Sequence, residues 1–450
     1  MKVMKFGGSS VGGTSQVRKT CDLIARRAKP GDIIIESAVG VDPKNNKNEK
    51  VTDMLIRICK TKPSHERLHS FDELKNRHYE IIDALGLDRQ IIASELKELE
   101  AILPLFDQSL KALDLFQSFG ERMSVNIVAA ELRAIGVEAA SYDAFDVGMM
   151  TDSNYGGAAP MHDAYARIQA AMKSVNHIAV VTGFIGKDID GNITTLGRGG
   201  SDYSAAIFAA ALGADSMELW TDVNGIKSAH PKIVPEAHTI RNMSYDEAKE
   251  LSFYGAKLHP KTIWPAMEKN IPVHIMNTFD PEGEFTVITH EKKVEEEVMK
   301  GITCDKGNYI VSMSSPRMIG QSGFLARILD AFEINRTDID MVSTSESSVS
   351  LTINNNELMK AILKDMEGLD ETMEVKVVEN KSIICVVGEG MKHVAGTSGR
   401  IFSALGKAGI SVEAISQGAS EINITFIVDD KDADNAVKAV HEEFFGPKSD

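Results

Sequence analysis

The sequence is poor in cysteine, in CxxC pairs and in positive charge, and each shortage excludes a class of protein. Its 450 residues include four widely spaced cysteines, Cys21, Cys59, Cys304 and Cys385. This spacing suggests neither a zinc site nor a disulfide framework, and reduced thiols are the simplest account of it. The formal net charge of −16 argues against nucleic acid or an anionic membrane as the main partner.

Long apolar runs and the familiar nucleotide motifs are also missing. No run approaches the ~18 apolar residues of a membrane span, and the N-terminus lacks the apolar segment of a secretory signal. We therefore expect a cytoplasmic protein. There is no Gly-x-x-x-x-Gly-Lys-Ser/Thr sequence and no protein-kinase motif set, so any phosphoryl transfer needs another architecture.

The chain is long enough for two or three domains. Up to about residue 290, short apolar runs such as Ile33–Ile35 and Ile178–Val181 alternate with amphipathic segments. This alternation predicts an α/β domain over residues 1–290, a central sheet covered by helices. Residues 64–135 are almost wholly helical in pattern and predict a helical excursion. In it, Glu121 would lie near the start of a helix over 121–132.

A charge-dense stretch, 291–300, predicts a linker, and an internal repeat follows it. Residues 301–380 and 381–450 each have the order strand, helix, strand, Ser-Glu turn, strand. Units this short would pack side by side. The first strand, near Tyr309, can be assigned to either repeat.

The most informative motif is Lys5-Phe6-Gly7-Gly8-Ser9-Ser10, which follows a short apolar start. Glycines let the backbone approach phosphate oxygens, N–H groups at a helix start point at an anion, and Lys5 adds a positive charge. By itself the hexapeptide suits a strand–turn–helix connection equally well.

Four further segments carry polar chemistry at turns. Gly197 to Asp202 surrounds Arg198 with glycines before a small-residue helix, an arrangement suited to an anion. The others contain Thr221-Asp222 after an apolar strand, Lys257 in a glycine turn, and Glu121 as a candidate cation binder. Thr221-Asp222 fits a loop at the carboxyl edge of a sheet, where open α/β folds bind ligands. An isolated Lys257 is usually a solvated surface charge, and a lone Glu121 at a helix start is more often only a partner of the helix dipole.

Together these motifs resemble the aspartokinases of the amino acid kinase family. The matching segments are Lys5–Val11, Ser37-Ala38, Phe119–Glu121, Thr182–Gly186, Leu196–Asp202, Trp220–Asp222, Gly255–Lys257 and His259-Pro260. The likeness spans nearly the whole chain, and the repeat is similar to the tandem ACT domains of that family. The resemblance implies an amino acid kinase fold followed by two ferredoxin-like ACT domains.

The resemblance implies transfer of the γ-phosphoryl of ATP to the side-chain carboxylate of L-aspartate. It assigns Lys5, Asp202 and Arg198 to catalysis, with Asp202 orienting Lys5. Substrate binding is assigned to Glu121 for the α-ammonium, Arg198 for the α-carboxylate, and Ser37, Thr52, Phe184 and Ser201 for the pocket. The nucleotide would be held by Lys5, Gly7, Gly8, Ser9, Thr221, Asp222, Lys227, Lys232 and Lys257. Mg²⁺ would enter with ATP, held mostly by phosphates and water.

The chain departs from the family pattern in two places. After Gly225-Ile226 the family has an aromatic residue and then Asp-Pro-Arg, whereas Lys227 and His230-Pro231-Lys232 stand here. This removes stacking and arginine contacts but keeps two positive charges. The loop after Ala38 also lacks a Gly-Lys pair.

In the first repeat, a set of residues matches the effector site of lysine-inhibited members. These are Met318, Ser322, Gly323, Phe324, Leu325, Asp340, Ser343, Thr344, Ser345 and Glu346. The resemblance thus predicts feedback inhibition by L-lysine across a homodimer of paired ACT domains, with the pairing of dimers into tetramers left open.

Two other functions stay open at this point. One is another amino acid kinase, acting on glutamate or N-acetylglutamate, although such enzymes generally lack the tandem repeat. The other is an amino-acid sensor with weak catalysis, which the Lys227 to Lys232 departure keeps open and the presence of Lys5, Arg198 and Asp202 opposes.

Overall fold

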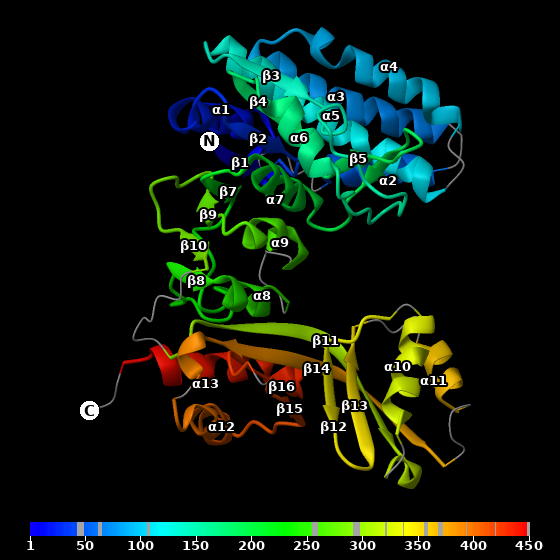
Figure 1. The fold of residues 1–450 in the computed structure, drawn as a ribbon, viewed down its shortest axis with the longest axis vertical. Helices are drawn as coiled ribbons and strands as arrows, with labels where there is room; N and C mark the ends of the chain where they lie inside the picture. Colours follow the sequence, from blue (N-terminus) through cyan, green and yellow to red (C-terminus); the bar gives the residue numbers. More distant parts are fainter. Residues whose placement is uncertain are drawn as a thin grey trace. The chain divides into compact units, whose positions relative to one another are not determined.

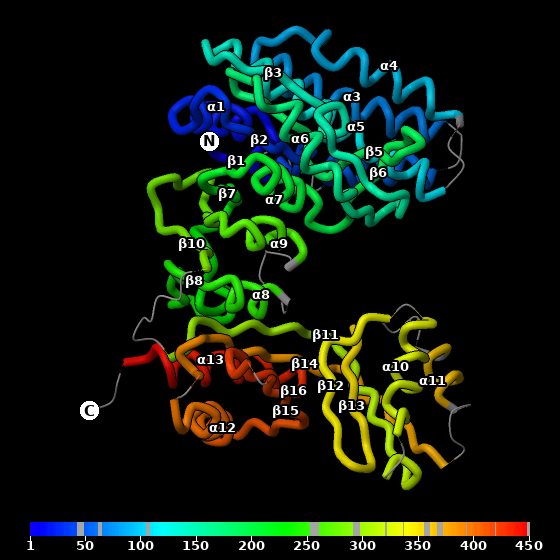
Figure 2. The backbone as a smooth tube through the Cα atoms, viewed as in Figure 1, coloured from blue at the N-terminus to red at the C-terminus, as the bar shows by residue number. Residues whose placement is uncertain are grey.

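The computed structural model describes residues 1–42, 49–61, 65–105, 109–253, 260–290, 298–319, 322–335, 337–354, 359–367, 372–392, 394–418 and 420–447. The chain forms two compact units (Figures 1 and 2). The first comprises Met1–Ile226, Arg241–Tyr245 and Leu258–Lys292, and the second comprises Lys227–Ile240, Asp246–Lys257 and Lys293–Asp450. The expected domain over 1–290 is thus interrupted, because two of its segments pack in the second unit. Most of the expected linker, 291–297, lies outside the described residues.

The first unit is built on an eight-stranded, mainly parallel sheet. In spatial order its strands are β3 (Ala139–Tyr142), β4 (Ile178–Thr182), β2 (Ile33–Glu36), β1 (Lys2–Phe6), β7 (Ser216–Thr221), β9 (Val273–Asn277), β10 (Thr286–Thr289) and β8 (Asn242–Ser244). Among its described strands, only β9 and β10 pair antiparallel. The central strands are buried along their whole length, as expected when helices cover both faces of a parallel sheet. The α/β prediction is confirmed.

Helices pack on the sheet of the first unit (Figure 1). One group contains α1 (Thr14–Arg27), α2 (Val51–Lys60), α3 (His65–Leu85), α4 (Ala93–Ile102) and α5 (Leu110–Ala134). Its apolar faces form one core with Phe6 and Trp220, whose rings stack with centroids 5.9 Å apart. Also in the unit are α6 (Ala164–Met172), α7 (Gly200–Leu212), α9 (Pro260–Glu268) and a hairpin of β5 (Ile185–Lys187) and β6 (Ile193–Thr195). The predicted helical excursion is therefore present.

The predicted helix start near Glu121 is wrong. Helix α5 begins at Leu110, where the Ser109 side chain caps it by accepting a hydrogen bond from the Ala112 N–H at 3.1 Å. Gly120 lies inside this helix, and a Cβ there would stand only 2.9 Å from the Ala38 Cβ. The glycine thus permits close packing of α5 on the loop after β2. Glu121 is mid-helix, so the helix dipole does not account for its charge.

The second unit contains one six-stranded antiparallel sheet. In spatial order its strands are β12 (Met341–Thr344), β13 (Ser348–Ile353), β11 (Gly301–Ser314), β14 (Glu374–Val387), β16 (Asn423–Asp429) and β15 (Ala414–Ser416). Its helices are α8 (Tyr245–Phe253, shared with the first unit at its first residue), α10 (Phe324–Ile334), α11 (Met359–Glu367), α12 (Thr397–Lys407) and α13 (Ala433–Phe445). The predicted order of strand, helix, strand and strand recurs in both halves, each with a further helix after it.

The two repeats share their long central strands. The first part of β11, Gly301–Asp305, pairs with Ile383–Val387, whereas its second part, Tyr309–Ser314, pairs with β13 and with Glu374–Val378. A register shift between Asp305 and Ile310 separates the two parts. The first strand, whose repeat the sequence left open, is therefore shared: one part of β11 belongs to each repeat.

The interrupting segment Lys227–Ile240 contributes to the core of the second unit. Ala229 and Val234 are buried in the same cluster as Ile384 and Val440. In the part of the chain that the structure describes, no helix is long and apolar enough to cross a membrane.

Candidate functional site

Lys5 and Asp202 form an ion pair at the carboxyl end of β1. The Lys5 Nζ lies 2.6 Å from the Asp202 Oδ1, and the side chains are 13% and 18% exposed. Asp202 is in the first turn of α7, where the helix dipole favours a carboxylate. Lys5 is therefore oriented by an element that arrives almost 200 residues later in the sequence.

The glycine turn after β1 packs against the loop after β2. Gly7 donates its N–H to the Trp220 carbonyl at 3.3 Å, and Gly40 donates to the Gly8 carbonyl at 3.0 Å. A Cβ on Gly8 would approach the Ala38 carbonyl oxygen to 3.0 Å, so the two loops leave little space for a side chain there. Ser9 follows within a short helical turn, Gly8–Ser10. Carboxyl ends of parallel strands are where open α/β sheets bind ligands.

Glu121 is a buried carboxyl beside this loop. Its side chain is 2% exposed, and its Oε1 accepts a hydrogen bond from the Ala38 N–H at 3.1 Å. Its Oε2 has no hydrogen-bond partner among the described residues. Burial raises the pKa of Glu121 to about 8. Ser37 and Thr52 are both half-buried. Ser37 precedes Ala38 on the loop after β2, and Thr52 is the second residue of α2.

Arg198 lies between two glycines in the left-handed region, Gly197 (φ 76°) and Gly199 (φ 70°). It is exposed, and its guanidinium makes no ion pair with the described acidic residues. The turn leads directly into α7 and so places Arg198 four residues before Asp202. Such a planar cation suits a carboxylate or phosphate.

The loop after β4 meets the first turn of α7. Phe184 has φ 68°, and its N–H donates to the Ser204 Oγ at 3.0 Å. A Cβ on Gly183 would stand 2.7 Å from the Ser201 Cβ. Phe184 and Ser201 are therefore brought together as neighbours. Ser204 was not among the predicted residues, and a serine inside a small-residue helix gives no signal of this contact.

The residues predicted to bind nucleotide divide between the two units. Thr221 ends β7, and its Oγ1 bonds the Asp222 Oδ1 at 3.1 Å. Lys227 and Lys232 belong to the second unit, where the Lys227 Nζ donates to the Thr239 Oγ1 at 2.7 Å and Lys232 is exposed. Lys257 lies outside the described residues.

The described residues hold no group of three or more His, Cys, Asp and Glu side chains that could bind a metal ion. The exposed Asp222 carboxylate stands at the end of β7. Mg²⁺ prefers oxygen ligands and keeps several bound waters. The Asp222 carboxylate therefore suits a Mg²⁺ ion whose other ligands are mainly phosphate oxygens and water.

Glu36 is a buried acidic residue that the sequence reasoning did not select. It ends β2 in register with Phe6 and Thr182 and is fully buried. Neither of its carboxyl oxygens has a partner among the described residues, and burial raises its pKa well above the usual range, opposed by Lys5. A charged residue that ends the apolar run Ile33–Ile35 was the available signal.

The predicted effector residues lie at opposite ends of β12. The loop after β11, which leads to Met318, adjoins the turn before β13, because the Ser315 N–H donates to the Ser347 carbonyl at 3.1 Å. The Ser345-Glu346 pair lies in that turn. Asp340 precedes β12 at its other end, where burial and the charges of Asp305 and Asp338 raise its pKa to about 6. Ser322, Gly323, Phe324 and Leu325 lead into α10, and Ser343 and Thr344 end β12.

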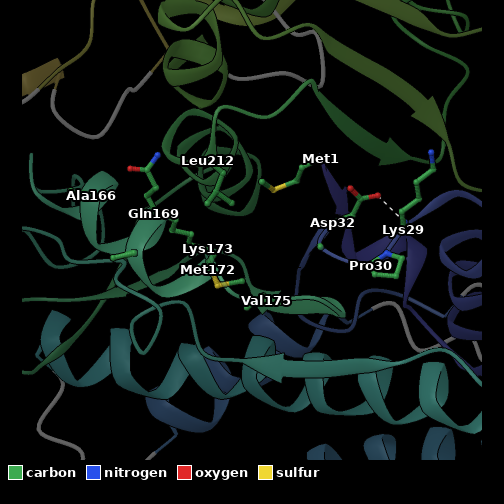
Figure 3. Close-up of a pocket in the computed structure, with 12 residues that line it drawn as sticks. Met1, Lys29, Pro30, Asp32, Ala166, Gln169, Met172, Lys173, Val175 and Leu212 are labelled. Atoms are coloured by element: carbon green, nitrogen blue, oxygen red, sulfur yellow. Dashed lines mark hydrogen bonds between the residues drawn. The ribbon is translucent and has the colours of Figure 1, made fainter.

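A cavity of about 710 Å³ opens at the amino ends of β1 and β2 (Figure 3). Met1 and Asp32, which precede β1 and β2, line it together with Lys29, Lys173 and Leu212. Asp32 is already bonded by the backbone N–H groups of Lys2 and Lys29. None of the residues predicted to bind substrate or nucleotide lines this cavity.

Comparisons with known proteins agree with this architecture over the whole chain. The profile of the amino acid kinase family matches residues 1–277, and an ACT domain profile matches 311–364 and 384–444. Aspartokinase 1, chloroplastic, of Arabidopsis thaliana is 33% identical over 459 residues, covering 98% of this chain and 80% of that protein. Lysine-sensitive aspartokinase 3 of Escherichia coli is 29% identical, covering 98% and 99%.

Solved structures give the same result. Aspartokinase III of E. coli, in complex with aspartate and ADP (R-state), matches with a TM-score of 0.83 at 27% identity, covering 99% of this chain and 100% of that one. Its complex with lysine and aspartate (T-state) gives 0.79. Aspartate kinase of Clostridium acetobutylicum gives 0.82 at 29% identity, covering 99% and 100%.

Proposed function

The chain belongs to the amino acid kinase family as an aspartokinase with ACT domains, and from that premise we propose which residues perform the reaction and what regulates it. The enzyme is an ATP-dependent phosphotransferase whose acceptor is the side-chain carboxylate of aspartate. That carboxylate is already ionised at neutral pH, so no general base is needed. Catalysis is then positioning and charge neutralisation.

Lys5 stabilises the transferring phosphoryl group in this proposal. The observation that supports it is the ion pair with Asp202, which holds the ammonium at the carboxyl end of β1 before any ligand binds. Gly7, Gly8 and Ser9 offer backbone N–H groups and a hydroxyl to the same phosphates. Asp202 is a positioning residue, since it acts through Lys5.

Two side chains of opposite charge recognise aspartate, and neither forms an ion pair with another described residue. Glu121 is the partner of the α-ammonium, and Arg198 is the partner of the α-carboxylate. Burial of Glu121 without a cation supports this assignment, because an ammonium would compensate the carboxylate where it now has one backbone hydrogen bond. Ser37, Thr52, Phe184 and Ser201 shape the rest of the pocket.

ATP is held by Thr221, Asp222, Lys227, Lys232 and Lys257 in addition to the glycine turn. Mg²⁺ enters with ATP and neutralises phosphate charge when bound, and Asp222 is the residue that would contact it. Reduced thiols fit a cytoplasmic setting, and the cysteines of this chain are free, with Cys21, Cys59 and Cys385 buried. The Arabidopsis relatives are named as chloroplastic proteins.

L-Lysine is the proposed inhibitor, bound by the first ACT repeat in a homodimer. Two relatives support this: one is named lysine-sensitive, and one was solved with lysine in a T-state. Within this chain, Glu346 adjoins the loop that leads to Met318, and its carboxylate suits an ε-ammonium. Asp340 stands at the far end of β12 and therefore serves a different part of the ligand or a partner's copy.

Hydroxamate formation tests both parts of the proposal. The enzyme is assayed with ATP, Mg²⁺ and one acceptor, which is aspartate, glutamate or N-acetylglutamate. Each assay is run with and without millimolar lysine, threonine or methionine. We expect turnover of aspartate and its inhibition by lysine. Turnover of glutamate in preference to aspartate would contradict the substrate assignment, and indifference to millimolar lysine would contradict the regulatory one.

A further inference from the structure

The segment that bears Lys227 and Lys232 is built into the second ACT repeat. Residues Lys227–Ile240 lie between two stretches of the first unit in sequence, yet they belong to the second unit. Ala229 and Val234 are 2% and 5% exposed within the core that contains β14, β16 and α13. The apolar contacts of the segment are therefore with the regulatory region.

Ser228 joins this segment to the repeat by two hydrogen bonds, and a third hydrogen bond connects it to His238 within the segment. It is fully buried, and its carbonyl accepts from the Ile302 N–H of β11 at 2.8 Å. Its Oγ lies 2.9 Å from the His441 Nε2 of α13 and accepts from the His238 N–H at 3.2 Å. One hydroxyl thus connects helix α13 with both ends of the segment.

A cluster of rings packs the segment against α13. His238 packs edge-on against Phe445 at a centroid distance of 4.8 Å, and His441 contacts the same Phe445 ring at 4.7 Å. At the base of the segment, Lys227 bridges to Thr239 through its backbone and its side chain. Lys227 and Lys232 are hence carried on a loop that His441, Ile302 and Phe445 of the second unit anchor.

We propose that Ser228 and His441 are positioning residues that set the nucleotide affinity of the enzyme from within the second ACT repeat. This rests on the proposed role of Lys227 and Lys232 in binding ATP. Loosening the Ser228 anchor lets the loop leave the conformation that presents these lysines. Because aspartate is assigned to Glu121 and Arg198 in the first unit, its binding is unaffected by that change.

The test uses the full-length enzyme with Ser228→Ala, His441→Phe and the double variant. We expect the KM for ATP, and the dissociation constant of ADP measured by calorimetry, to rise about fivefold to tenfold with each single change. The double variant should add little, since both changes remove the same bond. The KM for aspartate should stay within about twofold of the wild type.

Arg400→Met is the matched control. Arg400 lies on α12, and its Nε is 2.8 Å from the Glu443 Oε1 of α13, the helix that also carries His441. The structure records no hydrogen bond or ion pair between Arg400 and the described segment Lys227–Ile240. The Arg400→Met substitution removes a contact with α13 but should leave the ATP affinity of the enzyme unchanged. Unchanged ADP affinity in Ser228→Ala, or an equal rise in both KM values, would overturn the inference. If His441→Phe does not fold, Ser228→Ala decides alone, because alanine fits the serine site.

Lys232→Met separates this inference from the function on which it rests. If it leaves the KM for ATP unchanged while Ser228→Ala raises it, the nucleotide role of Lys232 fails but the anchoring of the loop stands. If Lys232→Met raises the KM and Ser228→Ala does not, the anchoring fails and the nucleotide role stands.

Discussion

The two halves of the proposed site treat charge in opposite ways. On the phosphoryl side, Lys5 is neutralised by Asp202 at 2.6 Å before any ligand arrives. On the aspartate side, Glu121 is buried with one backbone donor, and Arg198 is exposed without an acidic partner among the described residues. The first arrangement is ready for a transition state, whereas the second is completed by the ligand itself. Catalytic rate and substrate affinity should therefore respond to different substitutions.

Removing the prepared charge gives the largest expected effect. Lys5→Ala should lower kcat by at least about 10³-fold, because no other described side chain supplies that charge at the end of β1. Initial rates of ADP formation measure it. Lys2→Ala is the control, since Lys2 lies on the same strand and pairs with Glu218 at 3.0 Å. Turnover that survives Lys5→Ala would refute the catalytic assignment.

Removing the unpaired acid should act on affinity. Glu121→Gln is expected to raise the KM for aspartate by about 10-fold to 100-fold, the worth of a hydrogen bond between charged groups, with a smaller effect on kcat. Steady-state kinetics in aspartate give the split. Glu131→Gln changes another buried acid on α5, 6% exposed, and should leave the KM unchanged. A loss confined to kcat would contradict the comparison.

The pH dependence follows from the same carboxyl. Because the pKa of Glu121 is raised to about 8, the unliganded enzyme binds a proton there at neutral pH. Aspartate must displace that proton, so the KM for aspartate should fall by up to about tenfold per pH unit below 8 and level off above it. Measurement from pH 6.5 to 9 in wild type and Glu121→Gln tests this. A pH-independent KM in the wild type would count against it.

Glu36 provides the smallest expected effect. Its raised pKa means that the folded state binds a proton that the unfolded state has released, so stability falls as pH rises above about 4.5. Glu36→Gln removes this loss and should stabilise the protein by about 1–3 kcal/mol at pH 7. Thermal unfolding at pH 5 and pH 8 measures the change, which should be larger at pH 8. If Glu36→Gln changed the stability by the same amount at pH 5 and at pH 8, the explanation would be contradicted.

Much of the architecture could be predicted from the sequence, because apolar runs and repeat order report burial directly. The α/β domain, the helical excursion and the repeated halves are all present. The errors arose where one residue serves a distant neighbour. Glu121 was expected at the start of a helix because Gly120 precedes it in the sequence, but Gly120 lies within α5, where its missing side chain makes room for Ala38. The assignment of residues 227–240 to the second unit depends on contacts with His441 and Ile302, which lie far along the chain.

The same limit applies to the site. Lys5 and Asp202 were paired through a family likeness, and the distance between them is a tertiary fact. Glu36 was passed over because a single acid after three isoleucines gives no indication of its neighbours. Asp340 and Glu346 were grouped through the resemblance to the effector site of lysine-inhibited family members, yet they flank the four-residue strand β12 at opposite ends.

The long strand β11 has a consequence for synthesis on the ribosome. Gly301 pairs with Val387, so the first part of β11 emerges well before its partner in β14 exists. The intervening chain completes the first repeat, which can close around the second part of β11 while the first part waits as an unpaired edge. The second repeat is thus the last to form, and nascent chains that stall in this interval expose a strand to neighbouring copies.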